Sequence, residues 1–308
     1  MALDRPSLVF LVGPTAAGKS AAAIALAERL DGEIVSCDSM QVYRGFDIGT
    51  DKPSAEDRAR IPHHLLDVVD PEAQFTAAEF AVLALEAVAG IRERGRLPLI
   101  AGGTGLYFKA LEEGLFPGPG RDDALRRLLD EEARTKSVEA LWRRLAAVDP
   151  AAAAKTGRRD RIRIVRALEV QALTGIPLSD HFRRTESRLA GFRTIKIGVQ
   201  WPRPELVRRI EERIDRMFAR GFVREVEDLL ARGVPETAPP FRALGYRHVL
   251  RSLRGEIGPA EAMEKTKIET RQYAKRQMTW FRKMKDVRWF SPPEMEAISA
   301  HVGAALAA

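Results

Sequence analysis

Three segments of strand length occur in the first third of the chain, with helical patterns between them. Residues 8–12 form an unbroken apolar run, as expected of a buried parallel strand, and residues 33–37 and 97–101 read as two further strands. Residues 21–30 and 75–93 hold helix formers with apolar residues at helical spacing, and Thr76 and Glu79 have the spacing of a capping box. Strands that alternate with helices predict an α/β fold with a parallel sheet flanked by helices.

The middle of the chain changes to helical patterns rich in arginine, without a strand signal. Residues 122–147 and 161–173 have this pattern, and they follow a Pro- and Gly-rich seam at 116–120. Alternating β-branched residues at 194–200 predict a strand that returns to the main sheet, and residues 204–220 and most of the remainder read as helix. We therefore expect an α/β core made of residues 1–116 and 192–308, interrupted by an all-helical insertion domain at 117–191.

A glycine-rich loop joins the first predicted strand to the first predicted helix. The loop fits the P-loop pattern G-x-x-x-x-G-K-[ST] and consists of Gly13, Pro14, Thr15, Ala16, Ala17, Gly18, Lys19 and Ser20. Backbone N–H groups of such a loop and the positive end of the following helix bind a diphosphate or triphosphate, as in ATP-binding proteins. Lys19 would add a positive charge, and the Ser20 hydroxyl could hold Mg²⁺.

One carboxylate follows the second predicted strand at the same edge of the expected sheet. Ligands of open α/β sheets bind outside the carboxyl ends of the strands, so Asp38 should face the same crevice as the glycine loop. P-loop kinases and NTPases usually add a strand that ends in a Mg²⁺-binding acid, whereas the third strand here ends in glycines 102–103 and Thr104. Glycines there would let the backbone approach a ligand closely. Asp38 is then either an indirect metal ligand or a general base.

Charge points to a polyanionic partner. The 308 residues have a net charge of +7 and a pI near 9.7. Residues 265–288 contain nine Lys or Arg and two acids, with Tyr273, Trp280, Phe281 and Trp289 in or next to the segment. This pattern is typical of a nucleic-acid-facing segment, and the alternative is a solvated helix face whose aromatic residues lie in the core.

Several classes of protein are excluded by composition. No apolar run approaches the roughly 20 residues of a membrane span, and the N-terminus lacks the architecture of a signal peptide. The single cysteine, Cys37, cannot form an internal disulfide and fits a reducing compartment, and the five scattered histidines lack zinc-ligand spacing. We expect a cytoplasmic protein without a membrane partner, with a monomer as the default state.

Seven segments in order along the chain resemble the tRNA dimethylallyltransferase (tRNA isopentenyltransferase, IPP transferase) family. They are residues 13–20, 38–44, 47–53, 62–68, 102–111, 241–249 and 270–283. The resemblance implies transfer of the dimethylallyl group of dimethylallyl diphosphate to N6 of the adenosine just 3′ of a tRNA anticodon, with diphosphate as the leaving group. It also implies a P-loop NTPase-like fold in which the glycine loop holds the diphosphate of the prenyl donor and not ATP.

The chemistry of this transfer fits the motifs. An adenine amine is a poor nucleophile, so the departing diphosphate must be neutralised, which loop amides, Lys19 and Mg²⁺ near Ser20 would do. The resemblance assigns the general base to Asp38 and a diphosphate-binding arginine to Arg213, with Arg209 as the second choice. The target base must leave its stack to reach such a crevice.

The resemblance also implies positions that contact tRNA. They are Asp38, Ser39, Met40, Gln41, Thr104, Arg126, Ile162, Arg163, Ile164, Val165 and Arg166. Several relatives begin the run that corresponds to residues 162–166 with a Gln-Arg pair. This chain has Ile162 at the first of these positions, so a polar contact with a base from that side chain is not expected. Arg163 and Arg166 would contact phosphates.

Three other functions remain open from the sequence. An adenylate isopentenyltransferase would keep the glycine loop and Asp38 but would need the basic segment less. A P-loop nucleotide kinase or NTPase would transfer or hydrolyse a phosphoryl group. A non-catalytic RNA-binding protein would not need the intact glycine loop together with Asp38.

Overall fold

The computed structural model describes residues 5–116 and 118–308 and divides into two units. The core unit comprises the chain up to Ala110 and Leu189–Ala308, and the insertion unit is Leu111–Arg188. The predicted insertion began at residue 117, which lies outside the described residues, as do residues 1–4 of the predicted core.

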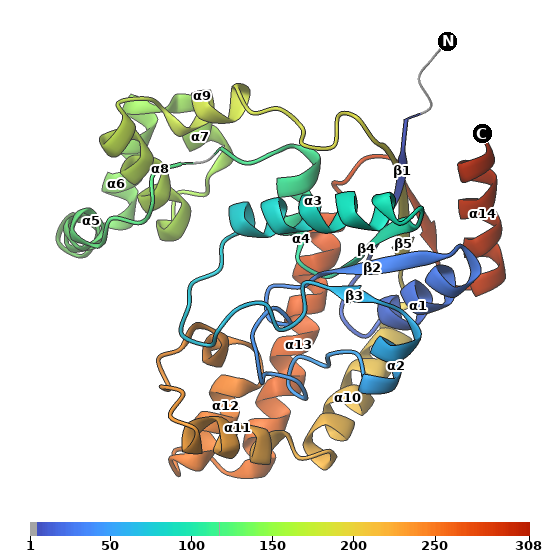
Figure 1. Cartoon of the computed structure of the whole chain (residues 1–308). Coiled ribbons are helices and arrows are strands. Elements are labelled where there is room, and N and C mark those ends of the chain that lie inside the picture. The colour runs from blue at the N-terminus through green and yellow to red at the C-terminus, as the bar shows by residue number, and fades with distance from the viewer. Residues whose placement is uncertain (1–4, 117) are drawn as a thin grey trace. The chain divides into compact units, whose positions relative to one another are not determined.

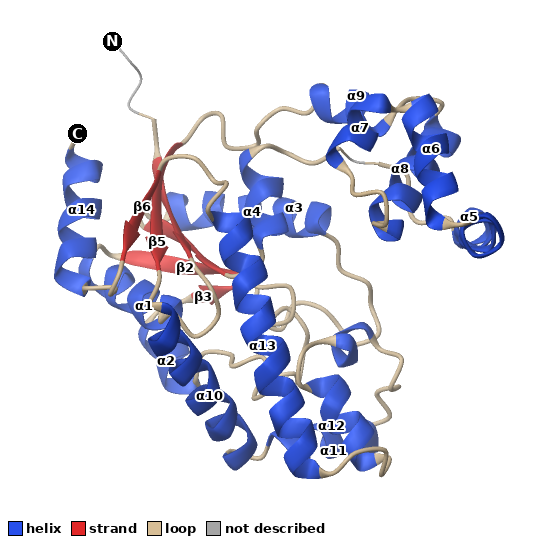
Figure 2. Cartoon of the chain, turned by 180° about the vertical axis from the view of Figure 1, so that it is seen from behind, coloured by secondary structure: helices blue, strands red, loops and turns tan. Residues whose placement is uncertain are grey.

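The core unit is built on a six-stranded parallel sheet (Figures 1 and 2). Its strands are β1 (Ser7–Val12), β2 (Gly32–Cys37), β3 (His63–His64), β4 (Leu97–Gly102), β5 (Arg193–Val199) and β6 (Val287–Phe290), in the order β3-β2-β4-β1-β5-β6. Val12 and Cys37 both pair with Gly102, so β1, β2 and β4 end at one edge of the sheet. The residues that follow these strands therefore emerge side by side there.

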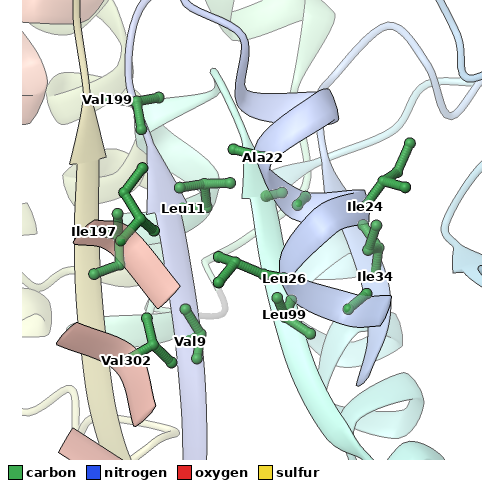
Figure 3. Close-up of a cluster of buried hydrophobic side chains, with 14 of the residues drawn as sticks. Val9, Leu11, Ala22, Ile24, Leu26, Ile34, Leu99, Ile197, Val199 and Val302 are labelled. Atoms are coloured by element: carbon green, nitrogen blue, oxygen red, sulfur yellow. The ribbon is translucent and has the colours of Figure 1, made fainter. Parts of the chain in front are cut away.

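Alternate residues of the central strands face two different layers. Val9 and Leu11 pack with α1 (Lys19–Arg29) and α14 (Met295–Ala307), as Figure 3 shows. On the other face, the ring of Phe10 contacts Phe108 of α4 (Gly105–Glu112), with ring centroids 5.0 Å apart, and α3 (Ala77–Glu93) also packs against β2 and β4. Coverage of both faces explains the uninterrupted apolar run of β1.

The chain beyond β5 is mostly helical. Its elements are α10 (Arg203–Ala219), α11 (Phe222–Ala231), η1 (Pro239–Arg242), α12 (Tyr246–Leu253) and α13 (Pro259–Phe281). A cluster of buried aromatic residues, including Phe222, Phe241 and Tyr246, packs against Val42 and Phe46. This packing fixes the segment that follows β2, close to the predicted site, and α13 runs from this cluster to the sheet (Figure 2).

The sequence predictions of secondary structure are confirmed for the main strands and for α3. Thr76 and Glu79 form the capping box, in which the Thr76 N–H donates to Glu79 Oε2 over 2.7 Å. The short edge strand β6 lies in a region that was read as helical, and Trp289 on it packs against Gly198, where a Cβ would lie 2.4 Å from the indole. The short helix α2 (Ala55–Arg60) begins at Ser54, whose side chain forms a capping box with Asp57. None of the described helices is both long and apolar enough to cross a membrane.

The insertion unit is all-helical. It consists of α5 (Asp123–Lys136), α6 (Val138–Val148), α7 (Pro150–Lys155), α8 (Arg161–Thr174) and α9 (Leu178–Arg183). The single helix predicted over 122–147 is broken at Ser137, which has a φ of 101° and caps α6 through its hydroxyl. The unit has its own apolar core, formed by residues such as Leu129, Leu141 and Leu168.

A fully buried carboxylate crosslinks this unit. Glu169 accepts two hydrogen bonds of 2.8 Å from Arg126, one of 2.6 Å from Arg166 and one of 2.9 Å from the Asp122 N–H. Burial alone would raise the pKa of Glu169, but the hydrogen bonds from Arg126 and Arg166 outweigh it and lower the pKa to about 2. The stabilisation is therefore complete at neutral pH and is lost as the pH falls from about 4.5 towards 2.

We expect Glu169→Gln to destabilise the insertion unit by about 3 kcal/mol, because two guanidinium groups lose their buried counter-charge. Urea unfolding followed by circular dichroism measures this change, and the variant should also lose part of the acid sensitivity. Glu131→Gln, which removes an exposed carboxylate paired with Arg134, is the matched control and should change the stability by less than about 1 kcal/mol. Equal effects of the two substitutions would contradict a crosslinking role.

Candidate functional site

The glycine loop has a backbone that glycine alone allows at two positions. A Cβ on Gly13 would lie 2.2 Å from the Val199 carbonyl oxygen, and Gly18 has a φ of 91° where it caps α1. Because α1 begins at Lys19, its positive end is directed at the loop. This geometry fits a bound phosphate group.

Two side chains from the region after β5, Arg209 and Trp201, donate hydrogen bonds to backbone carbonyls of the glycine loop. Arg209 Nε donates to the Ala16 carbonyl over 3.1 Å, and the guanidinium lies 4.7 Å from the ring centre of Trp201. Trp201 Nε1 in turn donates to the Ala17 carbonyl over 3.2 Å. Arg209, the second choice for the diphosphate, is thus bound to the loop backbone.

A pocket at the carboxyl edge of the sheet brings together the three residues predicted to be catalytic, Lys19, Asp38 and Arg213. It is lined by Thr15, Lys19, Ser20, Asp38, Gln41, Thr50, Asp51, Ala101, Gly102, Gly103, Arg213, Tyr273 and Gln277. The lining contains two cations and two carboxylates from segments far apart in the sequence. Such a convergence of charged groups in a concavity is typical of an active site.

Lys19 is the first cation of the pocket. Its Nζ donates to the Pro14 carbonyl over 2.7 Å. Burial lowers the pKa of Lys19 to about 7, and the charge of Arg213 adds to the effect, while Asp38 opposes it. A bound anion would favour the ammonium form again.

Arg213 is the second cation, and it lies against the glycine loop as predicted for a diphosphate ligand. Its Nη1 donates to the Thr15 hydroxyl, and its Nε lies 3.0 Å from Asp51 Oδ2. The buried Nε nevertheless has no hydrogen bond of good geometry to any described residue. An oxygen of a bound diphosphate could supply the missing acceptor.

Asp38 is held in a tight turn after β2. Its Oδ1 accepts the N–H of Met40 over 2.8 Å and that of Gln41 over 3.4 Å. The Ser39 N–H donates to the Thr104 hydroxyl over 3.0 Å, so the turn is tied to the end of β4. These bonds fix the carboxylate relative to the sheet, a geometry that a general base would require.

The side chain of Gln41, a predicted tRNA contact, already makes hydrogen bonds within the protein. Its Oε1 accepts the Ser36 hydroxyl over 2.9 Å, and its Nε2 donates to the carbonyls of Thr50 and Asp51, each over 3.2 Å. Donation from Nε2 to a base would require one of its two bonds to break, whereas Oε1 accepts only one bond and can accept another.

The sequence reasoning missed the roles of two residues of α13. Gln277 Oε1 accepts the Thr15 N–H over 2.8 Å, and its Nε2 donates to the Gly103 carbonyl over 2.9 Å. Burial, followed by the charge of Asp38, raises the pKa of Tyr273 to about 12, which keeps its phenol protonated. Both residues were part of the basic segment, and a test of its helical period would have placed them on one face.

The glycines at the end of β4 make room for protein side chains, and Gly102 and Gly103 also line the pocket, so their close approach to a ligand stays a prediction. A Cβ on Gly103 would lie 2.3 Å from Gln277 Nε2, and one on Gly105 would lie 2.2 Å from the indole of Trp280. These glycines let α13 pack onto the end of the sheet.

The basic segment combines both interpretations of its sequence. Ala274, Gln277 and Phe281 are buried on one face of α13, and the cations Lys275 and Arg276 are exposed on the other. Phe281 is buried, Trp280 packs against Gly105, Trp289 packs against Gly198 and Tyr273 lines the pocket, so these aromatic residues follow the alternative interpretation, in which they contact the protein itself.

In the insertion unit, two predicted tRNA contacts are wrong. The side chains of Ile164 and Val165 are buried in the core of that unit, because the 162–166 run is helical and presents only some of its residues to solvent. Ile162 and Arg163 are exposed. Arg126 and Arg166 are bound to Glu169, which gives them a structural role.

The residues of the pocket fit Mg²⁺ as an oxygen-liganded ion shared with a phosphate. The described residues contain no group of three or more His, Cys, Asp or Glu arranged to hold a metal. Ser20, Asp38 and Asp51 nevertheless supply hydroxyl and carboxylate oxygens to the pocket. Mg²⁺ commonly binds through few protein oxygens together with substrate phosphates and water.

Known proteins resemble this chain over nearly its whole length. A family model described as IPP transferase matches residues 41–284. A protein of Geobacter metallireducens named tRNA dimethylallyltransferase is 51% identical over 290 residues, which are 94% of each chain. One of Geobacter sulfurreducens with the same name is 49% identical over 299 residues, which are 96% of each chain.

Solved structures agree. The tRNA isopentenylpyrophosphate transferase of Bacillus halodurans is 38% identical and superimposes with a TM-score of 0.72, covering 98% of this chain and 97% of its own. A eukaryotic dimethylallyltransferase described as acting on tRNA is 26% identical with a TM-score of 0.81, covering 97% of this chain and 77% of its own. The P-loop NTPase-like α/β fold predicted from the sequence is confirmed, and the chain belongs to the IPP transferase family.

Proposed function

We propose that this protein transfers the dimethylallyl group of dimethylallyl diphosphate to N6 of the adenosine just 3′ of a tRNA anticodon. One observation carries the proposal: the cations Lys19 and Arg213 and the carboxylate Asp38 line a single pocket at the end of a phosphate-binding loop. The cations suit a leaving diphosphate, and the carboxylate suits a nucleophile that must lose a proton. The names of the relatives support tRNA as the acceptor.

The reaction is a substitution at an allylic carbon. The N6 lone pair forms a bond to C1 of the dimethylallyl group, and the C1–O bond breaks with its electron pair going to diphosphate. The N6 nitrogen, now positive, loses a proton to the Asp38 carboxylate. The products are N6-isopentenyladenosine in the tRNA and diphosphate.

The glycine loop stabilises the leaving group. Its amides, the Lys19 ammonium and the Arg213 guanidinium would meet the negative charge that grows on diphosphate as the bond breaks. Ser20 would hold Mg²⁺, which supplies further neutralisation of the diphosphate when bound. Thr15 and Gln277 keep the loop in shape around the anion.

The acceptor base must be extruded to reach this pocket. The turn from Asp38 to Gln41, with Ser39, Met40 and Thr104, would border the base. The exposed cations of α13 and Arg163 of the insertion unit would contact tRNA phosphates. Cytoplasmic location and a monomeric state are further predictions from the sequence.

We expect Arg213→Ala to lower kcat/KM for dimethylallyl diphosphate by about 10- to 100-fold, because a charge-assisted contact with the leaving group is lost. Steady-state kinetics with saturating tRNA measure this loss. Arg208→Ala, which removes an exposed arginine of the same helix that pairs with Glu205, is the control. Normal binding and turnover of the donor by the Arg213 variant would refute the assignment.

Nucleoside mass spectrometry tests the function directly. The protein is incubated with Mg²⁺, dimethylallyl diphosphate and unmodified tRNA or AMP, and the nucleosides are then analysed. We expect N6-isopentenyladenosine in the anticodon loop of tRNA only. Prenylation of AMP alone would favour an adenylate isopentenyltransferase, and phosphoryl transfer from ATP without prenylation would favour a kinase.

A further inference from the structure

Asp51 lies in the wall of the pocket, where its carboxylate oxygens face the candidate Mg²⁺ site but where its contact with Arg213 has no assigned role. Its carboxylate Oδ2 is 3.0 Å from Arg213 Nε, and Oδ1 is 4.0 Å from Nη1 of Arg220. Arg213 also donates from Nη1 to the Thr15 hydroxyl. The guanidinium is therefore held on one side by the glycine loop and on the other by Asp51.

The segment that carries Asp51 is itself firmly attached. The Glu225 carboxylate of α11 accepts three successive backbone N–H groups over 2.9, 2.5 and 3.2 Å, those of Asp47, Ile48 and Gly49. Tyr246 donates its hydroxyl to the same carboxylate over 2.6 Å, and burial raises the pKa of Tyr246 so that it remains a donor. A Cβ on Gly49 would lie 2.2 Å from the Phe222 ring, so the segment is pressed against the aromatic cluster.

The other end of the segment is tied to the turn that holds Asp38. Gln41 Nε2 donates to the carbonyls of Thr50 and Asp51, as described above. Asp51 has a φ of 54°, a left-handed conformation that Asp and Asn tolerate better than most residues. Asp51 thus stands on a backbone fixed at both ends, close to the pocket.

The charge of Asp51 needs an explanation, because a carboxylate near a diphosphate site repels the ligand. Its place beside the guanidinium of Arg213 supplies one. An arginine side chain has many rotamers, and a fixed anionic partner reduces the freedom that it must lose when the donor binds. For this carboxylate to favour donor binding, the entropy that it saves in ordering Arg213 must exceed the repulsion between the carboxylate and the diphosphate.

We propose that Asp51 is a positioning residue that keeps the Arg213 guanidinium against the glycine loop, ready for the diphosphate of the prenyl donor. The inference rests on the proposed function, in which Arg213 binds the leaving group. It adds a link from Glu225, through the 47–51 segment, to the phosphate-binding arginine.

A double-mutant cycle tests the inference. Asp51→Asn keeps the size of the side chain and tolerates the left-handed backbone, so the variant should fold, which thermal unfolding verifies. We expect kcat/KM for dimethylallyl diphosphate to fall about tenfold, because the guanidinium loses the carboxylate that orders it, with KM for tRNA unchanged. In an Arg213→Ala background the same substitution should have no further effect, because the residue acts through Arg213. Glu212→Gln, which removes an exposed carboxylate of α10 paired with Arg208, is the matched control and should be neutral.

Several outcomes would overturn the inference. If Asp51→Asn has the kinetics of the wild type, Asp51 does not position Arg213. If the variant binds the donor more tightly, the repulsion between the Asp51 carboxylate and the diphosphate outweighs any positioning effect. An equal loss in both backgrounds would show that Asp51 acts independently of Arg213, and a loss rescued by additional Mg²⁺ would make it a metal ligand. Each of these results leaves prenyl transfer by the wild-type protein intact, whereas absence of that transfer would refute the proposed function itself.

Discussion

Asp38→Asn should lower kcat by about 10²–10⁴-fold while the affinity for dimethylallyl diphosphate stays close to that of the wild type. The amide oxygen of Asn can still accept the N–H groups of Met40 and Gln41, so the turn after β2 should persist. An amide cannot accept the proton that N6 releases. Single-turnover kinetics with tRNA, together with calorimetry of donor binding, separate the chemical step from binding.

The control and the contrary outcome follow from the same geometry. Asp70→Asn removes an exposed carboxylate that pairs with Arg44 and should leave kcat unchanged. If Asp38→Asn turns over normally, Asp38 is not the base. If turnover persists but loses its dependence on Mg²⁺, the carboxylate is a metal ligand, which is the alternative that the sequence left open.

Lys19→Ala should lower kcat/KM for dimethylallyl diphosphate by about 10²–10³-fold, the usual effect of removing one hydrogen-bond donor to a developing negative charge.

The wild-type protein should also show a characteristic pH dependence of its affinity for the diphosphate. Burial lowers the pKa of Lys19 to about 7 in the free protein, so above that pH the side chain is mostly a neutral amine. This amine must take up a proton before it can bind the diphosphate as an ammonium. Donor affinity should therefore fall by roughly tenfold per pH unit on the alkaline side of 7.

Calorimetry in buffers of different ionisation enthalpy measures both the affinity and the proton uptake. Lys19→Arg keeps a permanent charge, so its donor affinity should follow only the ionisation of the donor itself. Subtracting that profile from the wild-type profile isolates Lys19. A wild-type affinity that matches the Lys19→Arg profile at neutral and alkaline pH would contradict the lowered pKa.

In the insertion unit, only some residues of the predicted tRNA-binding run 162–166 have exposed side chains. The resemblance implied five tRNA contacts in the 162–166 run, but a helix turns its residues through 100° each, so the run cannot present them all to one partner. Ile164 and Val165 face the core of the unit, and Arg166 reaches Glu169. Position in the sequence located the run, and the helical period separated its exposed members from its buried ones.

The sequence by itself determined the parts of this protein that depend on neighbouring residues. The apolar run of β1, the glycine loop and the start of α1 are one continuous signal, and Asp38 follows β2 directly, so their meeting at one sheet edge could be predicted from parallel topology. The capping box of α3 is equally local.

Only the tertiary structure decided which distant side chains complete the pocket. Gln277 reaches Thr15 across 262 residues of sequence, and Arg213 meets Asp51 because Glu225 and the aromatic cluster hold the 47–51 segment in place. Such contacts arise from the packing of α10, α11 and α13 around the end of the sheet. No local pattern encodes them, because their energy depends on burial and on partners that the chain brings together only when it folds.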